Sequence, residues 1–438
     1  MLKPNNEIKE IYFETYGCTA NQNSSEIMKG LVAQAGINIT NNPEIADIIV
    51  INSCIVKTPT QEKIRRRISD LLKKNKKIIL AGCMPRLNKN KLKDPNLYLL
   101  DTSQIRNILN LIRDISSNKV KCDKYLKQRQ EIKLNLPKIS NEKIIRITQI
   151  SEGCFGKCTY CIVRLAKGKL FSYPKEKIIE SIKKDIASGG KEIWITSQDN
   201  AAYGNDFKKY LLPELLREIL NIKGNFFVRL GMMNPNNVKK ILSELIDIYK
   251  HPKMFKFLHI PIQSGSNKIL KAMNRQYKIQ DVLKIIDKFK KEIPDLTIST
   301  DIIVGYPGET ERDFQETLNV IKKIKPEMLN RSNFYFRPGT PAEKFKNSKF
   351  QIPSEIVKKR AIKLMKLHLK ICNEKQKKYL GKKFKILVDK KGFKDTWLGR
   401  SENYKLFAVH CKKNILGKRL NVIVKKATPH YLISEITD

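Results

Sequence analysis

Apolar runs alternate with stretches of helical polar and apolar spacing along the first third of the chain. Three of the apolar runs each lead directly into a cysteine: EIYFETYGC ends at Cys18, ADIIVINSC at Cys54 and KKIILAGC at Cys83. Each run is typical of a short buried strand, and residues 24–35 and 60–74 between them have helical spacing. Alternating strands and helices predict a parallel sheet, in which ligands bind just beyond the carboxyl ends of the strands. We therefore expect the three cysteines to converge.

A second alternation follows a polar, lysine-rich stretch, residues 119–141, which we interpret as a linker. Six further apolar runs are separated by helical stretches. This repeat of strand then helix predicts a parallel barrel with fewer than the full eight units, whose active residues gather at the carboxyl-terminal rim. The predicted strands are 144–150, 192–196, 226–231, 255–260, 296–304 and 329–336.

The pattern changes again after a lysine-rich helical stretch at 354–378. Short strands and turns then predict a small all-β barrel, and residues 376–438 hold 16 basic and 5 acidic residues. Small β-barrels commonly stack aromatic side chains on RNA bases, although the same side chains also fill barrel cores. The aromatic residues interleaved with these basic residues include Phe384, Phe393, Trp397, Tyr404 and Phe407.

The expected fold class is therefore α/β with three domains. An amino-terminal parallel α/β domain (1–118) is followed by the linker (119–141), a central partial (β/α)6 barrel (142–375) and the all-β tail (376–438). With 438 residues, of which 41% are hydrophobic, the chain can bury ordinary cores, and this excludes wholesale disorder.

The net charge and the cysteine content indicate the kind of partner and the cellular compartment. A formal net charge of +43 favours a polyanionic partner, most commonly a nucleic acid. No stretch approaches the roughly 20 consecutive apolar residues of a membrane helix, and the first residues lack the apolar core of a signal peptide. We therefore expect a cytoplasmic protein that does not contact a membrane. In a reducing compartment, its nine cysteines are better candidates for metal ligands or catalytic thiols than for disulfides.

The segment SEGCFGKCTYC is the most informative part of the sequence. Cys154, Cys158 and Cys161 form a C-x3-C-x2-C arrangement directly after a predicted strand. Three thiolates can hold three irons of a cubane iron-sulfur cluster and leave the fourth iron open for a ligand, whereas ordinary clusters take four cysteines. Structural zinc is the alternative, but it requires a fourth ligand that the neighbouring sequence does not offer.

The cysteine spacing, with Tyr160 just before the last cysteine, resembles the cluster loop of radical S-adenosylmethionine (AdoMet, SAM) enzymes. The order of domains resembles the methylthiotransferases among them, in which a TRAM-type β-barrel follows the radical SAM barrel. The finer motifs resemble the archaeal and eukaryotic branch, which modifies N6-threonylcarbamoyladenosine at position 37 of tRNA. These motifs are TYGCTANQNS, INSCIVKTPT, AGCMPR, EIWITSQDNAAYG, RLGMMNP, LHIPIQSGS, TDIIVGYPGET and FYFRPGTPA.

This resemblance implies two [4Fe-4S] clusters and AdoMet as cofactors. By the resemblance, Cys154, Cys158 and Cys161 bind the radical cluster, and the three strand-end cysteines bind an auxiliary cluster that handles sulfur. It further implies AdoMet contacts for a larger set of residues, some of which have simple structural roles as alternatives. The predicted AdoMet contacts are Gly189, Gly190, Glu192, Arg229, Gln263, Ser264 and Gly305.

The resemblance also implies the partners. They are the anticodon loop of tRNA, a reductase or other electron donor, and a sulfur donor. Within the same chemistry, the alternatives are methylthiolation of isopentenyladenosine in tRNA or of an aspartate of a ribosomal protein. An iron-sulfur RNA-binding regulator without turnover is the alternative from a different class of protein.

Overall fold

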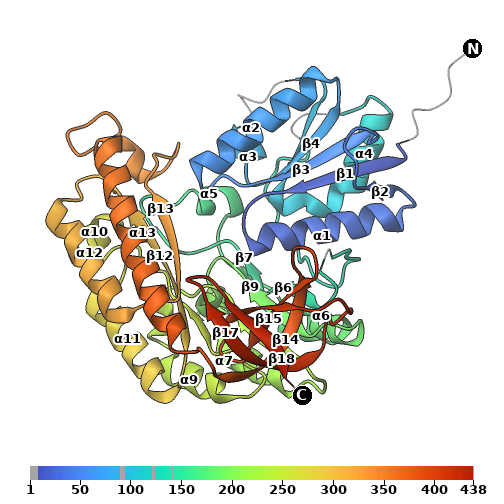
Figure 1. Ribbon diagram of the computed structural model, residues 1–438. Coiled ribbons are helices and arrows are strands. Elements are labelled where there is room, and N and C mark those ends of the chain that lie inside the picture. The colour runs from blue at the N-terminus through green and yellow to red at the C-terminus, as the bar shows by residue number, and fades with distance from the viewer. Residues whose placement is uncertain (1–7, 89–93, 121–123, 141, 438) are drawn as a thin grey trace, which may run out of the picture. The chain divides into compact units, whose positions relative to one another are not determined.

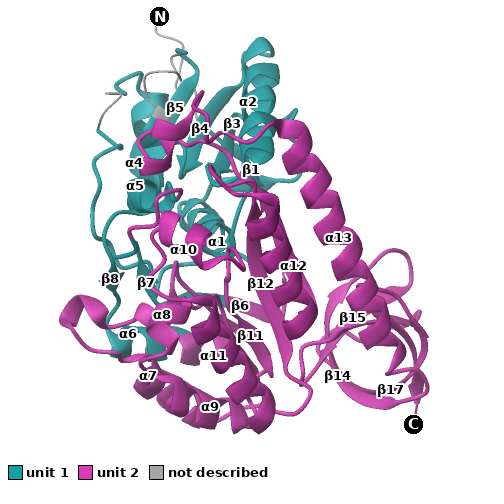
Figure 2. Ribbon diagram, turned by 90° about the vertical axis from the view of Figure 1, so that its left-hand side faces the viewer, with its two compact units in different colours: residues 1–141, 147–156, 161–181 teal, residues 142–146, 157–160, 182–438 magenta. Residues whose placement is uncertain are grey.

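The computed structural model describes residues 8–88, 94–120, 124–140 and 142–437. The chain divides into two compact units, which Figure 2 distinguishes by colour. Unit 1 comprises residues 1–141, 147–156 and 161–181, and unit 2 comprises residues 142–146, 157–160 and 182–438. None of the helices in the described ranges combines the length and the apolar character that crossing a membrane requires.

Unit 1 is built on a five-stranded parallel sheet with the strand order β2-β1-β3-β4-β5 (Figure 1). Its elements are β1 (Glu10–Thr15), α1 (Thr19–Gln34), β2 (Asn38–Thr40), β3 (Ile48–Ser53), α2 (Thr58–Lys73), β4 (Lys77–Gly82), α3 (Pro85–Asn88), β5 (Leu97–Asp101), the 3-10 helix η2 (Thr102–Asn107), α4 (Ile108–Ser116), β7 (Ser151–Glu152), α5 (Val163–Lys167) and β8 (Phe171–Ser172). The predicted parallel sheet is confirmed.

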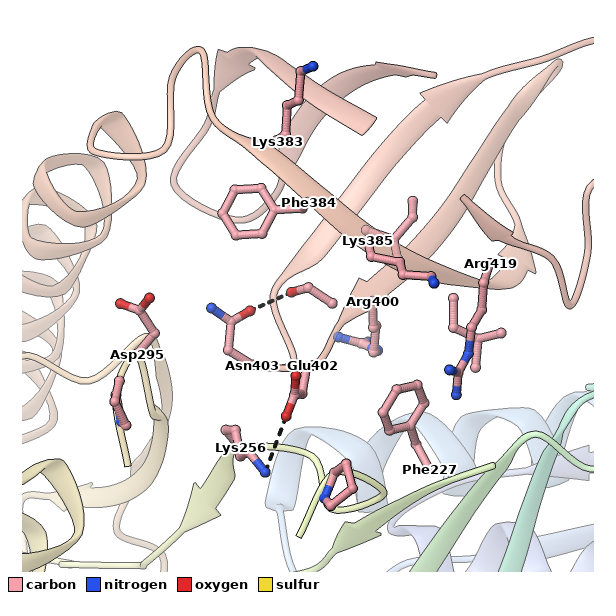
Figure 3. A pocket seen from close by; sticks show the side chains of 15 residues that line it. Phe227, Lys256, Asp295, Lys383, Phe384, Lys385, Arg400, Glu402, Asn403 and Arg419 are labelled. Carbon is pink, nitrogen blue, oxygen red and sulfur yellow. Dashed lines mark hydrogen bonds and ion pairs between the residues drawn. The ribbon is translucent and has the colours of Figure 1, made fainter. Parts of the chain in front are cut away.

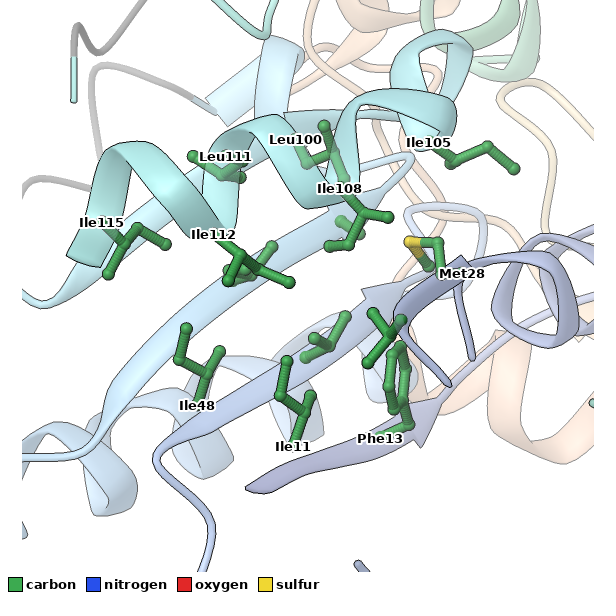
Figure 4. Packing of buried hydrophobic residues seen from close by; sticks show 14 of the residues in the cluster. Ile11, Phe13, Met28, Ile48, Leu100, Ile105, Ile108, Leu111, Ile112 and Ile115 are labelled. Carbon is green, nitrogen blue, oxygen red and sulfur yellow. The ribbon is translucent and has the colours of Figure 1, made fainter. Parts of the chain in front are cut away.

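Helices cover both faces of this sheet. Strand β3 is accordingly apolar at consecutive positions. Ile48 and Val50 pack against α1 and α4, while Ile49 and Ile51 pack against α2. Figure 4 shows the first of these layers, in which the side chains of α4 lie over Ile11 and Ile48. A continuous apolar run is typical of a strand that is buried on both faces, and α1 begins directly after Cys18.

The segment interpreted as a linker is packed on unit 1 over its described residues. Tyr125, Leu126 and Leu134 are buried, and Tyr125 joins the apolar layer beneath α4. Lys133 is fully buried as well. These few apolar positions lack a regular period and are outnumbered by lysines. The sequence pattern therefore indicated only a polar connection.

Unit 2 contains the predicted partial barrel. Strands β11, β12 and β13 are parallel, β9 and β10 are parallel, and a bridge between Val228 and Met254 links the two groups. Strand β6 (Ile145–Gln149), which runs from unit 2 into unit 1, completes the six strands beside β9. The six predicted strands are confirmed, with ends that differ by up to three residues.

The other elements of unit 2 follow in chain order. They are α6 (Lys175–Ala187, which starts in unit 1), β9 (Glu192–Thr196), η3 (Asn200–Ala202), η4 (Asn205–Phe207), α7 (Leu212–Asn221), β10 (Phe227–Leu230), α8 (Pro235–Val238), α9 (Leu242–Lys250), β11 (Phe257–His259), α10 (Asn267–Ala272), α11 (Ile279–Glu292), β12 (Thr297–Val304), α12 (Glu311–Ile324), β13 (Met328–Asn333), η5 (Pro341–Phe345), α13 (Ser354–Lys377), β14 (Lys383–Lys391), β15 (Thr396–Ser401), β16 (Leu406–His410), β17 (Arg419–Ala427) and β18 (Leu432–Thr437). The last five strands form a closed barrel in the order β14-β15-β16-β18-β17, as the sequence predicted.

This small barrel closes the amino end of the partial barrel. In the turn between β15 and β16, Tyr404 adopts a φ of 60°, and its ring lies 4.8 Å from that of Phe255 and 4.7 Å from that of Phe257. The backbone of the turn is held as well, since Lys256 N–H donates to Glu402 O at 2.9 Å. Burial raises the pKa of Tyr404 to about 12. The two barrels of unit 2 therefore share a buried aromatic cluster of Phe255, Phe257 and Tyr404.

We predict that Tyr404→Ala lowers the stability of unit 2 by about 3 kcal/mol or more, because the truncation removes an aromatic ring from a packed core. The measurement is chemical denaturation followed by far-UV circular dichroism. Phe393→Ala is the matched control: Phe393 is 79% exposed in the same barrel, and its truncation should change stability by less than about 0.5 kcal/mol. Equal shifts for the two variants would contradict this shared cluster.

Candidate active site

Cys18, Cys54 and Cys83 lie at one edge of the sheet of unit 1. Cys54 and Cys83 directly follow β3 and β4, and Cys18 lies three residues beyond β1. The strands β1, β3 and β4 are parallel neighbours, so their carboxyl ends meet at the same edge. The expected convergence of the three cysteines is confirmed.

Asn21 lies beside two of these three thiols, those of Cys18 and Cys83. Its Oδ1 is 4.0 Å from the Sγ of Cys18 and 3.9 Å from the Sγ of Cys83. Its Nδ2 donates to Tyr16 O at 2.8 Å and to Ser53 O at 2.9 Å. Asn21 therefore ties the turn that carries Cys18 to the end of the strand that carries Cys54.

Gly17 makes the close approach of Cys18 and Cys54 possible. Its φ is 111°, in a region that strongly favours glycine. A Cβ atom at this position would lie 2.9 Å from Cys54 Cβ and 3.2 Å from Cys54 Sγ. A side chain at position 17 would therefore push the two cysteine segments apart.

The donor set of this site consists of three thiols, the ligand type that iron-sulfur clusters take. Within the described ranges, no three histidine, cysteine or carboxylate side chains are arranged to hold one metal ion. Cysteines that bind a cubane cluster each take a different iron, so they need not point at one centre. Burial raises the pKa of the Cys83 thiol to about 12, and the nearby Lys167 opposes this rise.

The second cysteine loop is divided between the units. In unit 1, Cys154 N–H donates to Gly168 O at 3.1 Å, and its Sγ accepts from Gly156 N–H at 3.2 Å. Cys161, also in unit 1, directly precedes the segment that forms α5. Cys158 belongs to unit 2.

Residues 157–160 are anchored on the loops at the carboxyl end of the partial barrel. Thr159 N–H donates to Met273 O at 3.1 Å, and its Oγ1 lies 2.8 Å from the hydroxyl oxygen of Tyr306. Asn274 Nδ2 donates to Lys157 O at 2.9 Å. Cys158 is thus held where parallel barrels place their active residues.

Arg275 joins Cys158 to two further loops of the same rim. Its Nη1 lies 3.2 Å from Cys158 Sγ, and its Nη2 donates to Asn234 Oδ1 at 3.3 Å. Asp199, just beyond β9, accepts from Asn234 N–H at 2.9 Å. Burial raises the pKa of Asp199 to about 6 although these hydrogen bonds lower it. The guanidinium of Arg275 therefore contacts the predicted ligand, and Asn234 connects it to the buried carboxyl group of Asp199.

Sequence reasoning missed Arg275, Asn234 and Asp199. Asp199 and Asn234 lie within the motifs EIWITSQDNAAYG and RLGMMNP, but the residues predicted from these motifs, Glu192 and Arg229, lie in the strands and not in the loops that follow them. Arg275 had no signal beyond its position in a polar turn after α10. A strict search of the segments that follow β9, β10 and β11 would have found all three.

The predicted AdoMet contacts Gly189 and Gly190 end α6 and precede β9. Their N–H groups donate to Ile186 O at 3.0 Å and to Asp185 O at 2.9 Å. With a φ of 90°, Gly189 terminates the helix in the manner that glycine favours. The structure thus supports the alternative structural role of the pair, at the amino end of the strand.

Glu192 and Arg229 contact the small β-barrel. The guanidinium of Arg229 lies 4.9 Å from the ring centre of Trp194 and 5.7 Å from that of Tyr404. Glu192 is fully buried and accepts from Trp194 Nε1 at 2.8 Å; burial and the nearby Asp389 raise its pKa to about 7. These contacts give both side chains a place in the closed end of the barrel and leave their predicted role in AdoMet binding without structural support.

Gln263, Ser264 and Gly305 do lie at the carboxyl end. Gln263 has a φ of 70° and forms a bridge with Ile302, and Gly305 directly follows β12. Ser264 is fully buried, with its Oγ 3.4 Å from Thr317 Oγ1. They share the rim with Cys158, although no measured contact joins them to it.

A cavity of about 610 Å³ in unit 2 has none of these cysteines among its described lining residues. It is bounded by strands of the small barrel and by the amino ends of β10, β11 and β12, and Figure 3 shows Phe384, Arg400 and Arg419 around it. Arg419 lies over the ring of Phe227 at 4.6 Å. Because it opens at the amino end, this cavity is separate from the candidate chemistry.

The cysteine environments predict an order of alkylation in the iron-free chain. Cys18 is exposed, whereas Cys83 is buried and its pKa is raised to about 12. Since the thiolate is the reactive form, iodoacetamide at pH 8 should modify Cys18 well before Cys83. Peptide mass spectrometry after timed quenching measures this order, and faster modification of Cys83 would contradict the described packing.

Three parts of the chain match known families. Residues 148–321 match the Radical SAM superfamily, residues 10–100 match Uncharacterized protein family UPF0004, and residues 377–437 match the TRAM domain. These matches fall on the partial barrel, the parallel sheet of unit 1 and the small closed barrel.

Solved structures with a similar fold include radical AdoMet enzymes. The radical S-adenosylmethionine methyltransferase TsrM from Kitasatospora setae aligns with a TM-score of 0.55 and 12% identity, covering 76% of this chain and 75% of that one. The cobalamin-dependent radical enzyme OxsB aligns with a TM-score of 0.51 and 13% identity, covering 81% of this chain and 56% of that one. At these identities the likeness concerns the fold alone.

Relatives along the whole chain are much more similar in sequence. A protein of Pyrococcus horikoshii named probable threonylcarbamoyladenosine tRNA methylthiotransferase is 41% identical over 428 residues, which cover 98% of this chain and 99% of that protein. The threonylcarbamoyladenosine tRNA methylthiotransferase of Homo sapiens is 34% identical, over 97% of this chain and 73% of the human protein. With the two groups of three cysteines and the three matched domains, this similarity shows that the chain belongs to the threonylcarbamoyladenosine tRNA methylthiotransferase family of radical SAM proteins.

Proposed function

We propose that the protein replaces the hydrogen on carbon 2 of N6-threonylcarbamoyladenosine, at position 37 of tRNA, with a methylthio group. The observation that carries this proposal is the presence of two separate groups of three cysteines in a member of this family. The reaction requires a radical, because no side-chain acid or base activates a C–H bond of an adenine ring. AdoMet bound at a reduced cluster supplies such a radical.

The residues around Cys158 support its role in the radical site. Cys154, Cys158 and Cys161 would hold three irons of a [4Fe-4S] cluster and leave the fourth iron for AdoMet. Arg275 places a half-buried positive charge beside the sulfur of Cys158, which favours the thiolate form that a metal ligand requires. Gln263, Ser264 and Gly305 remain our proposed AdoMet contacts at this rim.

We further propose a second [4Fe-4S] cluster in unit 1. Asn21 lies beside the thiols of Cys18 and Cys83, and Gly17 allows Cys54 to approach the same turn, so the site brings sulfur donors together. Three cysteines again leave one iron open. This open iron would take the sulfur that is transferred, which comes from a separate sulfur donor, while a reductase or other donor supplies electrons in the cytoplasm.

The small β-barrel supports tRNA binding through its exposed side chains. Tyr404, Trp397 and Phe407 are buried, so they are not available to RNA. Phe393, in contrast, is 79% exposed at the turn between β14 and β15, and Lys394 Nζ lies 5.6 Å from its ring centre. An aromatic ring beside lysines can stack on an unpaired base while the lysines contact phosphates. A splayed base of a single-stranded loop is a suitable target.

The two cysteine groups predict two different losses. Cys158→Ala should abolish the reductive cleavage of AdoMet, because it removes a radical-cluster ligand. Cys54→Ala should retain some cleavage but yield no methylthio product, because only sulfur handling is lost. Anaerobic assays with dithionite measure 5'-deoxyadenosine and the modified nucleoside in parallel. Wild-type cleavage by the Cys158 variant would overturn the radical assignment, and a wild-type protein that releases no 5'-deoxyadenosine would favour the RNA-binding regulator.

The exposed aromatic residue gives a second prediction. Phe393→Ala should weaken binding of an anticodon stem-loop by about tenfold, since one base stack contributes roughly 1–3 kcal/mol. Fluorescence anisotropy at fixed salt measures the affinity. Phe207→Ala is the matched control, because Phe207 is 62% exposed in unit 2 outside the small barrel. Unchanged binding by the Phe393 variant would remove the stacking role.

The substrate is tested most directly in cells. Nucleoside mass spectrometry of tRNA, with and without the gene, should show 2-methylthio-N6-threonylcarbamoyladenosine only when the gene is present. Loss of a methylthiolated isopentenyladenosine instead, or of a modified ribosomal protein aspartate, would replace the proposed substrate. The names of the relatives do not favour either alternative.

A further inference from the structure

Unit 1 contains a buried group of three charged side chains that the proposed mechanism has not used. Lys133 Nζ lies 2.8 Å from both carboxylate oxygens of Glu152, and Lys167 Nζ lies 3.0 Å from Oε1 of the same residue. The side chains of Lys133, Glu152 and Lys167 are 0%, 6% and 2% exposed. Thr102 accepts from both lysines, through its carbonyl oxygen at 2.6 Å and its hydroxyl oxygen at 3.1 Å.

The group carries more positive than negative charge. Two ammonium groups share the carboxylate of Glu152, and the charged groups around them are Glu131, which also interacts with Arg106 and Arg129, and the pair of Arg86 with Asp101 at 3.4 Å. An uncompensated charge in a protein interior is costly, so buried charges are normally paired. The excess positive charge therefore indicates that an anionic group belongs nearby.

Lys167 belongs to a segment that packs beside one of the strand-end cysteines. It is the last residue of α5, and the α5 segment packs on Cys83 and Met84 through Ile162 and Ala166. Arg86, three residues after Cys83, fixes the end of α5 by donating to Ala166 O at 2.6 Å. Burial lowers the pKa of Lys167, whereas the charges of Glu152, Cys83 and Cys18 raise it. The charges together outweigh burial, so the net shift of the pKa is upward.

Lys133 occupies a different place in the group. Its strongest electrostatic partners are Glu152, Lys167 and Asp101, and burial lowers its pKa. Glu152 thus pairs with both Lys133 and Lys167. Of the two lysines, Lys167 is the one whose charge interacts with the thiols of Cys83 and Cys18. Cys161 lies only six residues before Lys167, so one short segment connects a predicted radical-cluster ligand to this cation.

We propose that Lys167 is a positioning residue that attracts an anionic sulfur species, hydrosulfide or methanethiolate, to the open iron of the auxiliary cluster. The inference rests on the proposed second cluster in unit 1. A cation beside the cysteines raises the local concentration of a small anion and favours its bound form. No bond to Lys167 forms or breaks. The side chain contributes only its charge, part of which Glu152 offsets.

The test uses the full chain with Cys154, Cys158 and Cys161 replaced by serine, so that only the auxiliary cluster can assemble. After anaerobic reconstitution, hydrosulfide is titrated and its binding is followed by the electron paramagnetic resonance spectrum of the reduced cluster. In this background, Lys167→Met should weaken hydrosulfide binding by about tenfold or more, as expected for the loss of one nearby charge at an effective dielectric constant of about 20. Lys167→Arg, which keeps the charge, should bind within a few-fold of the background protein.

Lys74→Met is the matched control. It also removes one positive charge from unit 1, but Lys74 is 57% exposed and pairs with Glu44 at the surface, so hydrosulfide binding should not change. The auxiliary cluster should also become harder to reduce in Lys167→Met and not in Lys74→Met, because a nearby positive charge stabilises the added electron. Unchanged hydrosulfide affinity in Lys167→Met would overturn the proposal.

Iron content separates the possible failures. If the background protein assembles no cluster at all, the second cluster itself is wrong. If the background holds a cluster and Lys167→Met does not, the lysine serves cluster assembly, and the proposed sulfur role is overturned. Should Lys167→Met fail to fold, Glu152→Gln decides, because it adds one unit of excess positive charge and must tighten hydrosulfide binding. Equal or weaker binding by the glutamine variant would contradict the proposal.

Discussion

The geometry of parallel strands is the constraint on which unit 1 depends. Three neighbouring strands end at one edge, and the chain leaves each strand through a cysteine. Asn21 and Gly17 then bring the three cysteine segments into contact, one by hydrogen bonds and the other by leaving out a side chain. Residues that are far apart in sequence can form a single sulfur-rich site only because the sheet holds their backbones in register.

In unit 2, the main structural constraint is the closure of an incomplete barrel. The turn that carries Tyr404 covers the amino end of the strands and places Arg229 and Glu192 among aromatic and charged partners. Cys158, Arg275 and Asp199 lie at the carboxyl end. The small β-barrel therefore has a structural role in unit 2, and only its outward side chains, such as Phe393, are free to meet RNA.

Buried charge distinguishes the two cysteine environments. Arg275 contacts the sulfur of Cys158 directly, whereas Lys167 lies beyond the thiols of unit 1 in a group shared with Glu152 and Lys133. Lys133 lies in the segment that the sequence predicted to be a linker, because its many lysines outnumber the few apolar residues that are buried in the structure. In both places a cation is removed from water and its charge acts at close range, where the effective dielectric constant is low.

The sequence by itself determined the strands, their order along the chain, the two groups of cysteines and the family, because these depend on local periodicity and on ordered motifs. The tertiary structure decided which side chains meet. In the structure, Glu192 and Arg229 lie at the closed end of the barrel, and Gly189 and Gly190 lie at a helix terminus. The contacts of Arg275 and Lys167 are seen only in the tertiary structure. Such contacts join residues that are distant in the chain, and a pattern read along one strand or helix carries no information about what packs across it.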